Sequence, residues 1–325
     1  MRLSGALLAL VMFGSPASTE PVEITAVPLA AFQTFGSSSS FGPLSWRGGL
    51  SLESDASAFG GFSGLALQDN CEQMLAISDA GRWFRTRLRY EGGRLAGLAG
   101  GELAPMRDSK GKPQRGKVWA DAEAITIISP GKFAVAYESR VRLGVYDIGT
   151  QGLDARFEPM PYPKEIDMGP DNGEIEALGL LRAGPHKGSY IAISERHTDA
   201  RNNLRAWLWR GRKILPFSIE RFEDYDITDL TALSDGTVLT LERSFSRTSL
   251  PGMAIRRFVP DLLKPGTTVT PELLFSGRVP FYAIDNMEGI ASCEHEGEAR
   301  ITVMSDNNFN ATLQRTLLLQ FAYEP

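Results

Sequence analysis

Short apolar segments separated by turn residues recur along the whole chain, and they repeat one pattern five times. In each unit a run opens with a hydroxyl or acidic residue, followed by a small residue and an aliphatic one. A second apolar run follows and ends in an acid. The first runs begin at Ser63, Glu123, Glu176, Thr231 and Glu288, and the second runs end at Asp79, Glu138, Glu195, Glu242 and Asp306. The starts lie 53 to 60 residues apart, close to the period of a four-stranded blade, which predicts a β-propeller with an acid-lined axis.

The individual runs favour antiparallel β structure. They carry branched and aromatic residues over roughly four to eight positions, and turn signals such as those at 129–132 and 233–237 separate them. No long segment keeps a helical period without a Gly or Pro. We therefore predict a single all-β propeller domain over residues 18–325, with five or six blades. The strands expected near 22–29 and 44–52 either complete the last blade or build a sixth.

The first residues have the features of an export signal. Arg2 precedes an apolar core over 6–13 and the small residues Ser15–Ala17, which is the order typical of a signal peptide. The core is much shorter than the about 20 apolar residues that span a bilayer. We expect a signal peptide over 1–17, a periplasmic or secreted protein, and no transmembrane segment.

Two cysteines occur, Cys71 and Cys293, near the opening strands of the first and fifth repeats. In an oxidising compartment a disulfide between them would join the two ends of the repeat array. Closing so long a loop stabilises a fold by about 4 kcal/mol or more in the chain-entropy model, before strain in the native state is subtracted. The alternative is two unpaired thiols. No Cys-x-x-Cys pair is present, which argues against a zinc ribbon or a thioredoxin-type site.

The charge of the chain limits its partners. The formal net charge is −5 and no run of Lys or Arg occurs, so no nucleic-acid partner is expected. The three histidines have no metal-ligand spacing, which argues against a zinc site. An acidic protein that binds anions needs local basic groups or a metal ion.

Further acids precede the repeat starts by two or three positions. Residues two apart on a strand point to the same face, so Asp121 joins Glu123 if the opening strand is innermost. Clustered carboxylates repel unless a cation, a shared proton or a basic partner is present. Oxygen-only ligands favour a hard cation such as Ca²⁺. The predicted ligands are Asp121, Glu123, Glu174, Glu176, Asp285 and Glu288. The alternative is that these acids only brace neighbouring loops through hydrogen bonds.

Arginines follow the strand-ending acids in four repeats. They are Arg82, Arg140, Arg196 and Arg243. Such pairs can be surface ion pairs worth under ~1 kcal/mol. An oriented guanidinium can instead bind a phosphate or carboxylate through two parallel hydrogen bonds. We therefore expect these four arginines to bind an anionic small molecule.

Five of the repeat motifs together resemble a known family. They are Phe62–Leu65, Ile77–Arg82, Asp121–Ile125, Asn172–Leu178 and Asp285–Ile290. In this order they resemble the bacterial exported proteins called phytase-like, or "esterase-like activity of phytase". The resemblance implies a β-propeller, an exported location and hydrolysis of phosphoesters assisted by calcium.

Two hypotheses from different classes follow. In the first, the chain is an exported hydrolase of phosphoesters in which Glu123, Glu176 and Glu288 are catalytic and a divalent cation polarises the phosphoryl group. In the second, it is a non-catalytic propeller that binds a small ligand or an envelope protein, since Ser63 and Thr231 interrupt the ring of acids. A glycosidase that uses two of the carboxylates is a third alternative.

Overall fold

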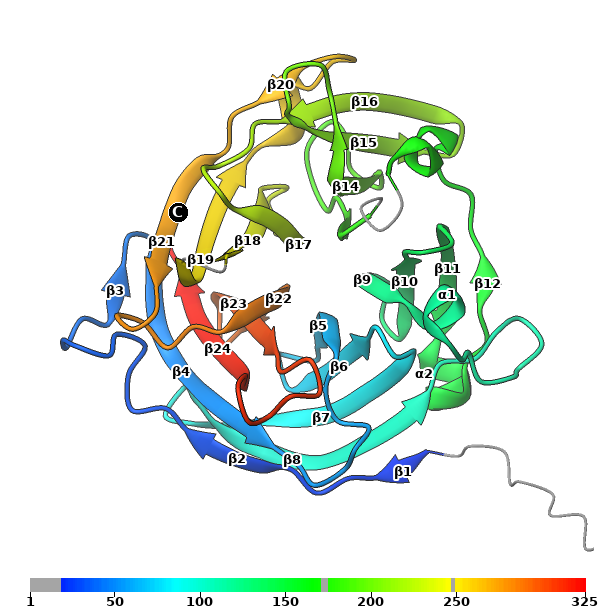
Figure 1. Ribbon diagram of the computed structural model, residues 1–325. Helices are drawn as coiled ribbons and strands as arrows, with labels where there is room; N and C mark the ends of the chain where they lie inside the picture. The colour runs from blue at the N-terminus through cyan, green and yellow to red at the C-terminus, as the bar shows by residue number, and fades with distance from the viewer. Residues whose placement is uncertain (1–18, 171–174, 247–248) are drawn as a thin grey trace, which may run out of the picture.

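The chain folds into a five-bladed propeller. The computed structural model describes residues 19–170, 175–246 and 249–325, and in these ranges five mainly antiparallel sheets surround a central axis (Figure 1). The prediction of an all-β propeller is confirmed, and the number of blades is five. The predicted signal peptide over 1–17 lies outside the described residues. Within those ranges, no helix has the length and apolar character needed to cross a membrane.

The strands of each blade follow one another outward from the axis in the order in which they pair. Blade 1 contains β5 (Phe62–Gln68), β6 (Gln73–Ser78), β7 (Arg82–Glu91), β8 (Arg94–Pro105) and β1 (Glu20–Pro21). Blade 2 contains β9 (Ala122–Ser129), β10 (Lys132–Tyr137), β11 (Arg142–Asp147) and β12 (Glu158–Pro159). Blade 3 contains β13 (Ala177–Leu180), β14 (Tyr190–Thr198), β15 (Leu204–Arg210), β16 (Lys213–Ile219) and β20 (Thr268–Val269).

The remaining two blades follow the same plan. Blade 4 contains β17 (Asp226–Ala232), β18 (Val238–Ser246), β19 (Ser249–Phe258) and β21 (Glu272–Arg278). Blade 5 contains β22 (Asn286–His295), β23 (Glu298–Asp306), β24 (Thr316–Tyr323), β4 (Leu44–Glu53) and β2 (Thr25–Pro28), with β3 (Ser40–Phe41) also paired to β4. Short helical turns lie between strands at α1 (Lys117–Ala120), α2 (Ile148–Gln151), η1 (Gly152–Asp154), η2 (Lys164–Met168) and η3 (Pro260–Leu262).

Blade 5 is built from both ends of the chain and closes the ring. Strand β4, from the N-terminal part, pairs with β24, with Leu52 opposite Thr316 and Leu44 opposite Tyr323. The strands expected near 22–29 and 44–52 therefore complete the last blade. The innermost strands β5, β9, β13, β17 and β22 each contact the next around the axis, so the first residues of these strands converge.

The core lies between neighbouring blades, and this explains the apolar runs in the sequence. Ala76 of β6 packs in the same cluster as Met304 of blade 5, whereas the next residue, Ile77, packs with Val135 of blade 2. Because both faces of each blade are covered, a middle strand is apolar at consecutive positions.

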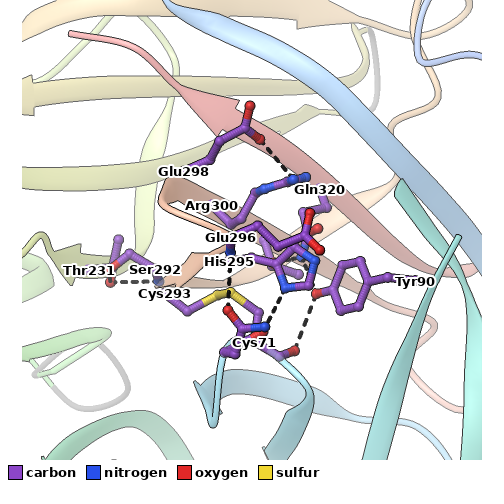
Figure 2. Close-up of a disulfide and its surroundings, with 12 residues drawn as sticks. Cys71, Tyr90, Thr231, Ser292, Cys293, His295, Glu296, Glu298, Arg300 and Gln320 are labelled. Atoms are coloured by element: carbon purple, nitrogen blue, oxygen red, sulfur yellow. Dashed lines mark hydrogen bonds and ion pairs between the residues drawn. A yellow bond between two sulfur atoms is a disulfide. The ribbon is translucent and has the colours of Figure 1, made fainter. Parts of the chain in front are cut away.

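A disulfide links blade 1 to blade 5. Cys71, in the turn between β5 and β6, is bonded to Cys293 of β22 (Figure 2). This confirms the predicted pairing. Nearby, the His295 ring stacks on Tyr90 with 4.0 Å between ring centres, and its Nδ1 lies 2.8 Å from the carbonyl oxygen of Asn70. The bridge joins two blades that share no strand pairing, so it adds a covalent link to the closure provided by β4 and β24.

Candidate functional site

A β-bulge recurs near the start of four innermost strands. The pairing between first and second strands skips one residue in β5, β9, β17 and β22, at Ser63, Glu123, Thr228 and Glu288. In β9, for example, Ala122 lies opposite Tyr137 and Ala124 opposite Ala136, so Glu123 has no opposite residue. Bulges redirect side chains and are common beside functional sites. Ser63, Glu123 and Glu288 all line a cavity at the start of these strands.

The bulge corrects the predicted repeat alignment in blade 4. The repeat was expected to start at Thr231, but the bulged residue is Thr228, three positions earlier. The Thr231 hydroxyl lies toward the opposite end of β17, 2.8 Å from the hydroxyl of Ser292. The repeat motif is hard to find in the blade 4 sequence because the residue after the bulge is Asp229, whereas the other blades have Gly or Ala at this position. Asp229 is buried and accepts hydrogen bonds from the backbone N–H groups of Leu230 and Ile290.

A second set of side chains comes from the part of each second strand that lies beside the start of the innermost strand. The backbone of Asp79 bonds to Gly61, and that of Glu138 to Asp121. Asp306 lies opposite Asn286. In blade 4 the residue at the corresponding position is Arg243, opposite Asp226.

The predicted acid of this repeat, Glu242, lies one residue earlier than that position. Its carboxylate is buried and accepts a hydrogen bond of 2.6 Å from Nε of Arg256. Glu242 is therefore not one of the residues that line the cavity. Blade 4 thus contributes a cation, Arg243, where the other four blades contribute the acids Asp79, Glu138, Glu195 and Asp306.

These residues enclose a small, strongly acidic cavity of about 220 Å³. Its lining carboxylates are Asp79, Asp121, Glu123, Glu138, Glu176, Glu195, Glu288 and Asp306, and its lining cations are Lys117, Arg196 and Arg243. Acids therefore outnumber cations by more than two to one among the described lining residues. An additional cation or bound protons would relieve their repulsion.

Burial changes the protonation of the acids. It raises the pKa of Glu123 and of Glu176 well above the ordinary value, and neighbouring carboxylates add to both shifts. Burial also raises the pKa of Glu288 to about 7, although Arg243 opposes the shift. For the same reason the pKa of Asp306 rises to about 6. Burial therefore favours the protonated form of these acids.

The acids form two groups that could each hold a cation. One oxygen from each of Asp121, Glu123 and Glu138 lies within 4.8 Å of the others, and the same holds for Glu138, Glu176 and Glu195. Glu138 belongs to both groups. All donors are carboxylate oxygens, the ligands that Ca²⁺ and other hard cations prefer. Nearby, Oδ1 of Asp79 is buried without a hydrogen-bond partner among the described residues. The donor set therefore fits a hard divalent cation.

The predicted ligands do not all join these groups. Glu288 lines the cavity, but its carboxylate accepts hydrogen bonds from Arg243 and from Nδ2 of Asn286, the latter at 2.7 Å. Asp285 does not line this acidic cavity. Its carboxylate accepts hydrogen bonds from the backbone N–H groups of Asn286 and Arg315. Glu174 lies outside the described residues.

Two residues of the groups, Glu138 and Glu195, were not predicted as ligands. The sequence signal for both was their place as strand-ending acids. Because a second strand runs beside the first in the opposite direction, the later part of the second strand lies beside the start of the innermost strand. That geometry brings Glu138 next to Asp121.

The four predicted arginines divide into two pairs. Arg196 and Arg243 line the cavity. Nε of Arg196 lies 2.9 Å from Oε2 of Glu195, and Nη1 of Arg243 donates to Oδ1 of Asn286 at 2.7 Å. Arg82 and Arg140 are not lining residues. The Arg140 guanidinium stacks instead on Trp119, 4.4 Å from the ring centre.

Solved structures with some likeness to this chain include propellers and glycosidases. The Dos1 propeller is 11% identical, with a TM-score of 0.35 and 86% of this chain and 75% of that chain covered. An α-L-arabinofuranosidase (CtGH43) from Clostridium thermocellum ATCC 27405 is 11% identical, with a TM-score of 0.41 and coverages of 74% and 81%. The Cellvibrio cellulosa α-L-arabinanase complexed with arabinohexaose is 11% identical, with a TM-score of 0.40 and coverages of 78% and 92%. These similarities are too low to carry an argument about function.

The family itself is identified by sequence. No curated protein matches the chain. A profile of the family described as "Phytase-like: Esterase-like activity of phytase" matches residues 57–309. This range covers more than half of the chain and contains the five repeat motifs. The chain therefore belongs to the phytase-like family.

Proposed function

We propose that this protein is an exported, metal-assisted hydrolase of phosphoesters, with its active site in the acidic cavity. One observation carries the proposal: two clusters of three acids share Glu138. They lie where the innermost strands begin, in a propeller of the phytase-like family. The disulfide between Cys71 and Cys293 supports export, because such bonds persist mainly in oxidising compartments. The expected substrate is an anionic small molecule.

Each set of side chains has a separate task in this proposal. Asp121, Glu123, Glu138, Glu176 and Glu195 would hold the cation, preferably Ca²⁺. A cation held there would polarise a phosphoryl oxygen and lower the pKa of a bound water. Arg196 and Arg243 would bind the remaining phosphoryl oxygens through charge-assisted hydrogen bonds. Glu288, held by Arg243 and Asn286, would transfer a proton to the leaving alcohol.

An assay on purified full-length protein tests this proposal. The protein would be stripped of metal, then supplied with Ca²⁺, Mg²⁺ or Mn²⁺ and assayed on phosphomonoesters and phosphodiesters. We expect turnover that requires a divalent cation and falls by at least about a hundredfold in Glu138→Gln, which keeps the side-chain shape but removes the shared charge. Glu294→Gln is the matched control, because Glu294 lines a separate hollow near the other ends of the innermost strands. Turnover that persists unchanged in Glu138→Gln, or is absent with every metal, contradicts the proposal.

A second candidate function is ligand binding without turnover. It is favoured by one observation: both cavity arginines already have carboxylate partners, Arg243 with Glu288 and Arg196 with Glu195. In that case the cavity would bind a cation that organises the mouth for a small ligand or an envelope protein. Calcium-dependent binding without hydrolysis of any ester distinguishes this candidate from the first.

A further inference from the structure

A larger groove opens directly beside the acidic cavity. It has a volume of about 910 Å³, and it shares Glu195, Arg196, Arg243 and Asn308 with the cavity lining. The groove and the cavity therefore lie on either side of the same four residues. The cavity alone, at about 220 Å³, is small, so a molecule with a phosphoryl group in the cavity would extend its organic part into the groove.

The groove has apolar side chains on a mixed-charge surface. Phe245 and Leu313 both line it, and they are 72% and 78% exposed. The partly buried Val279 also lines it and adds aliphatic surface. Single exposed apolar residues are common, but several that gather in one concave site indicate a place where an apolar group is bound.

The charges of the groove do not match a polyanion. Its charged lining residues are Glu195, Asp226, Asp285, Arg196, Arg243 and Arg315. Acids and cations are equal in number here, and the acidic cavity adjoins them. Arg315 lies 3.5 Å from Asp285, and Arg196 lies 2.9 Å from Glu195. A ligand with many phosphates would meet as many carboxylates as guanidinium groups, which opposes its binding.

We propose that the groove binds the organic part of the substrate, and that the substrate is a phosphate ester of an apolar alcohol, such as an aryl ester. This inference rests on the proposed function, in which the phosphoryl group occupies the acidic cavity. Hydrolysis forms a P–O bond to the oxygen of water and breaks the P–O bond to the ester oxygen. The alcohol leaves with one proton of the water, and the phosphate retains or releases the other.

Binding of non-hydrolysable analogues tests the groove without requiring turnover. Phenylphosphonate and methylphosphonate would be titrated calorimetrically into the full-length protein saturated with Ca²⁺. We expect phenylphosphonate to bind about tenfold more tightly, because an apolar contact of this size typically contributes that much. Phe245→Ala and Leu313→Ala should each reduce this preference severalfold and leave the affinity for methylphosphonate unchanged. Phe35→Ala and Leu262→Ala are matched controls, because both residues are exposed and neither lines the groove.

The outcomes separate the groove from the proposed function. Equal affinity for the two phosphonates, or a preference that survives in Phe245→Ala and Leu313→Ala, overturns the groove assignment even if esters are hydrolysed. A ring preference that both variants reduce, without hydrolysis of any ester, supports the groove and overturns the proposed hydrolase. Failure of both phosphonates to bind the folded, calcium-loaded protein overturns the groove assignment. In the hydrolase assay, phenyl phosphate should have a higher kcat/KM than glycerol phosphate.

Discussion

Arg243 donates a hydrogen bond to the carboxylate of Glu288 across the boundary between blades 4 and 5. The interaction exists because blade 4 has an arginine where blade 5 has Asp306 at the corresponding position of the second strand. Arg243 thereby places one cation among the carboxylates of the cavity and opposes the effect of burial on Glu288.

Removing that cation should make Glu288 a weaker acid. In Arg243→Met, the pKa of Glu288 should rise further above its value of about 7, because burial then acts without the opposing charge. Carboxyl-carbon NMR titration of the metal-free protein measures this shift. Arg315→Met is the control, since Arg315 pairs with Asp285. A pKa of Glu288 that stays the same or falls in Arg243→Met contradicts the assigned interaction.

Calcium should stabilise the fold by binding to the two clusters of acids that share Glu138. At a free concentration one hundred times the dissociation constant, one bound ion adds about 2.7 kcal/mol to the free energy of unfolding. Calorimetric melting with Ca²⁺ and after chelation should show this gain. Glu138→Gln should lose most of it, because Glu138 belongs to both groups. Glu294→Gln should retain it, and an equal gain in both variants would place the ion elsewhere.

The metal-free protein should become less stable as the pH rises. A carboxyl whose pKa is raised in the folded state favours folding in its protonated form, so its stabilising effect is lost between its unfolded and folded pKa values. For Glu288 these are about 4.5 and about 7, a change of roughly 3 kcal/mol at most. Asp306 adds a smaller change that is complete near its pKa of about 6.

Urea unfolding of the metal-free protein at pH 5 and pH 8 measures this effect. The free energy of unfolding should be lower at pH 8, and Glu288→Gln should reduce the difference. Calcium should also reduce it, since a bound cation compensates the ionised acids. Greater stability at pH 8 than at pH 5 in the absence of metal would show that these carboxyls are not destabilised by burial.

Loss of the disulfide should destabilise the ring without changing its secondary structure. Replacing Cys71 and Cys293 by Ser should lower the free energy of unfolding by about 4 kcal/mol, because the bridge closes a very long loop in the unfolded chain. Urea midpoints and far-ultraviolet circular dichroism measure stability and structure, respectively. Reduction of the unmodified protein provides an independent comparison. A midpoint that does not move under either treatment contradicts a stabilising role.

The blades could be predicted from the sequence because their packing is periodic. Each middle strand packs on two neighbours, as Ala76 and Ile77 do, and this produces the repeated apolar runs. The apolar runs do not show whether β4 completes the last blade or begins a sixth one, because the same pattern suits an inner or an outer strand. The pairing of Leu52 with Thr316 decides it.

The residues of the site could be predicted less fully than the blades, because their positions depend on strand register. A shift of one residue moves a strand side chain to the opposite face. Glu242 and Arg243 are adjacent in sequence, yet Glu242 pairs with Arg256 whereas Arg243 lines the cavity. In blade 4 the sequence pattern predicts a repeat start at Thr231, whereas the bulged residue is Thr228. Only the pairing of the strands shows where the bulge lies.

The shared blade also has a consequence for synthesis of the chain. Strand β4 has 10 residues and is held by β2 on one edge, but its other edge is paired only when β24, near the C-terminus, has been made. Until then a growing polypeptide carries a long open strand edge, which is a template for aggregation with other chains. A chaperone that binds Leu44–Glu53 during translation or secretion would cover this open strand edge until β24 is available.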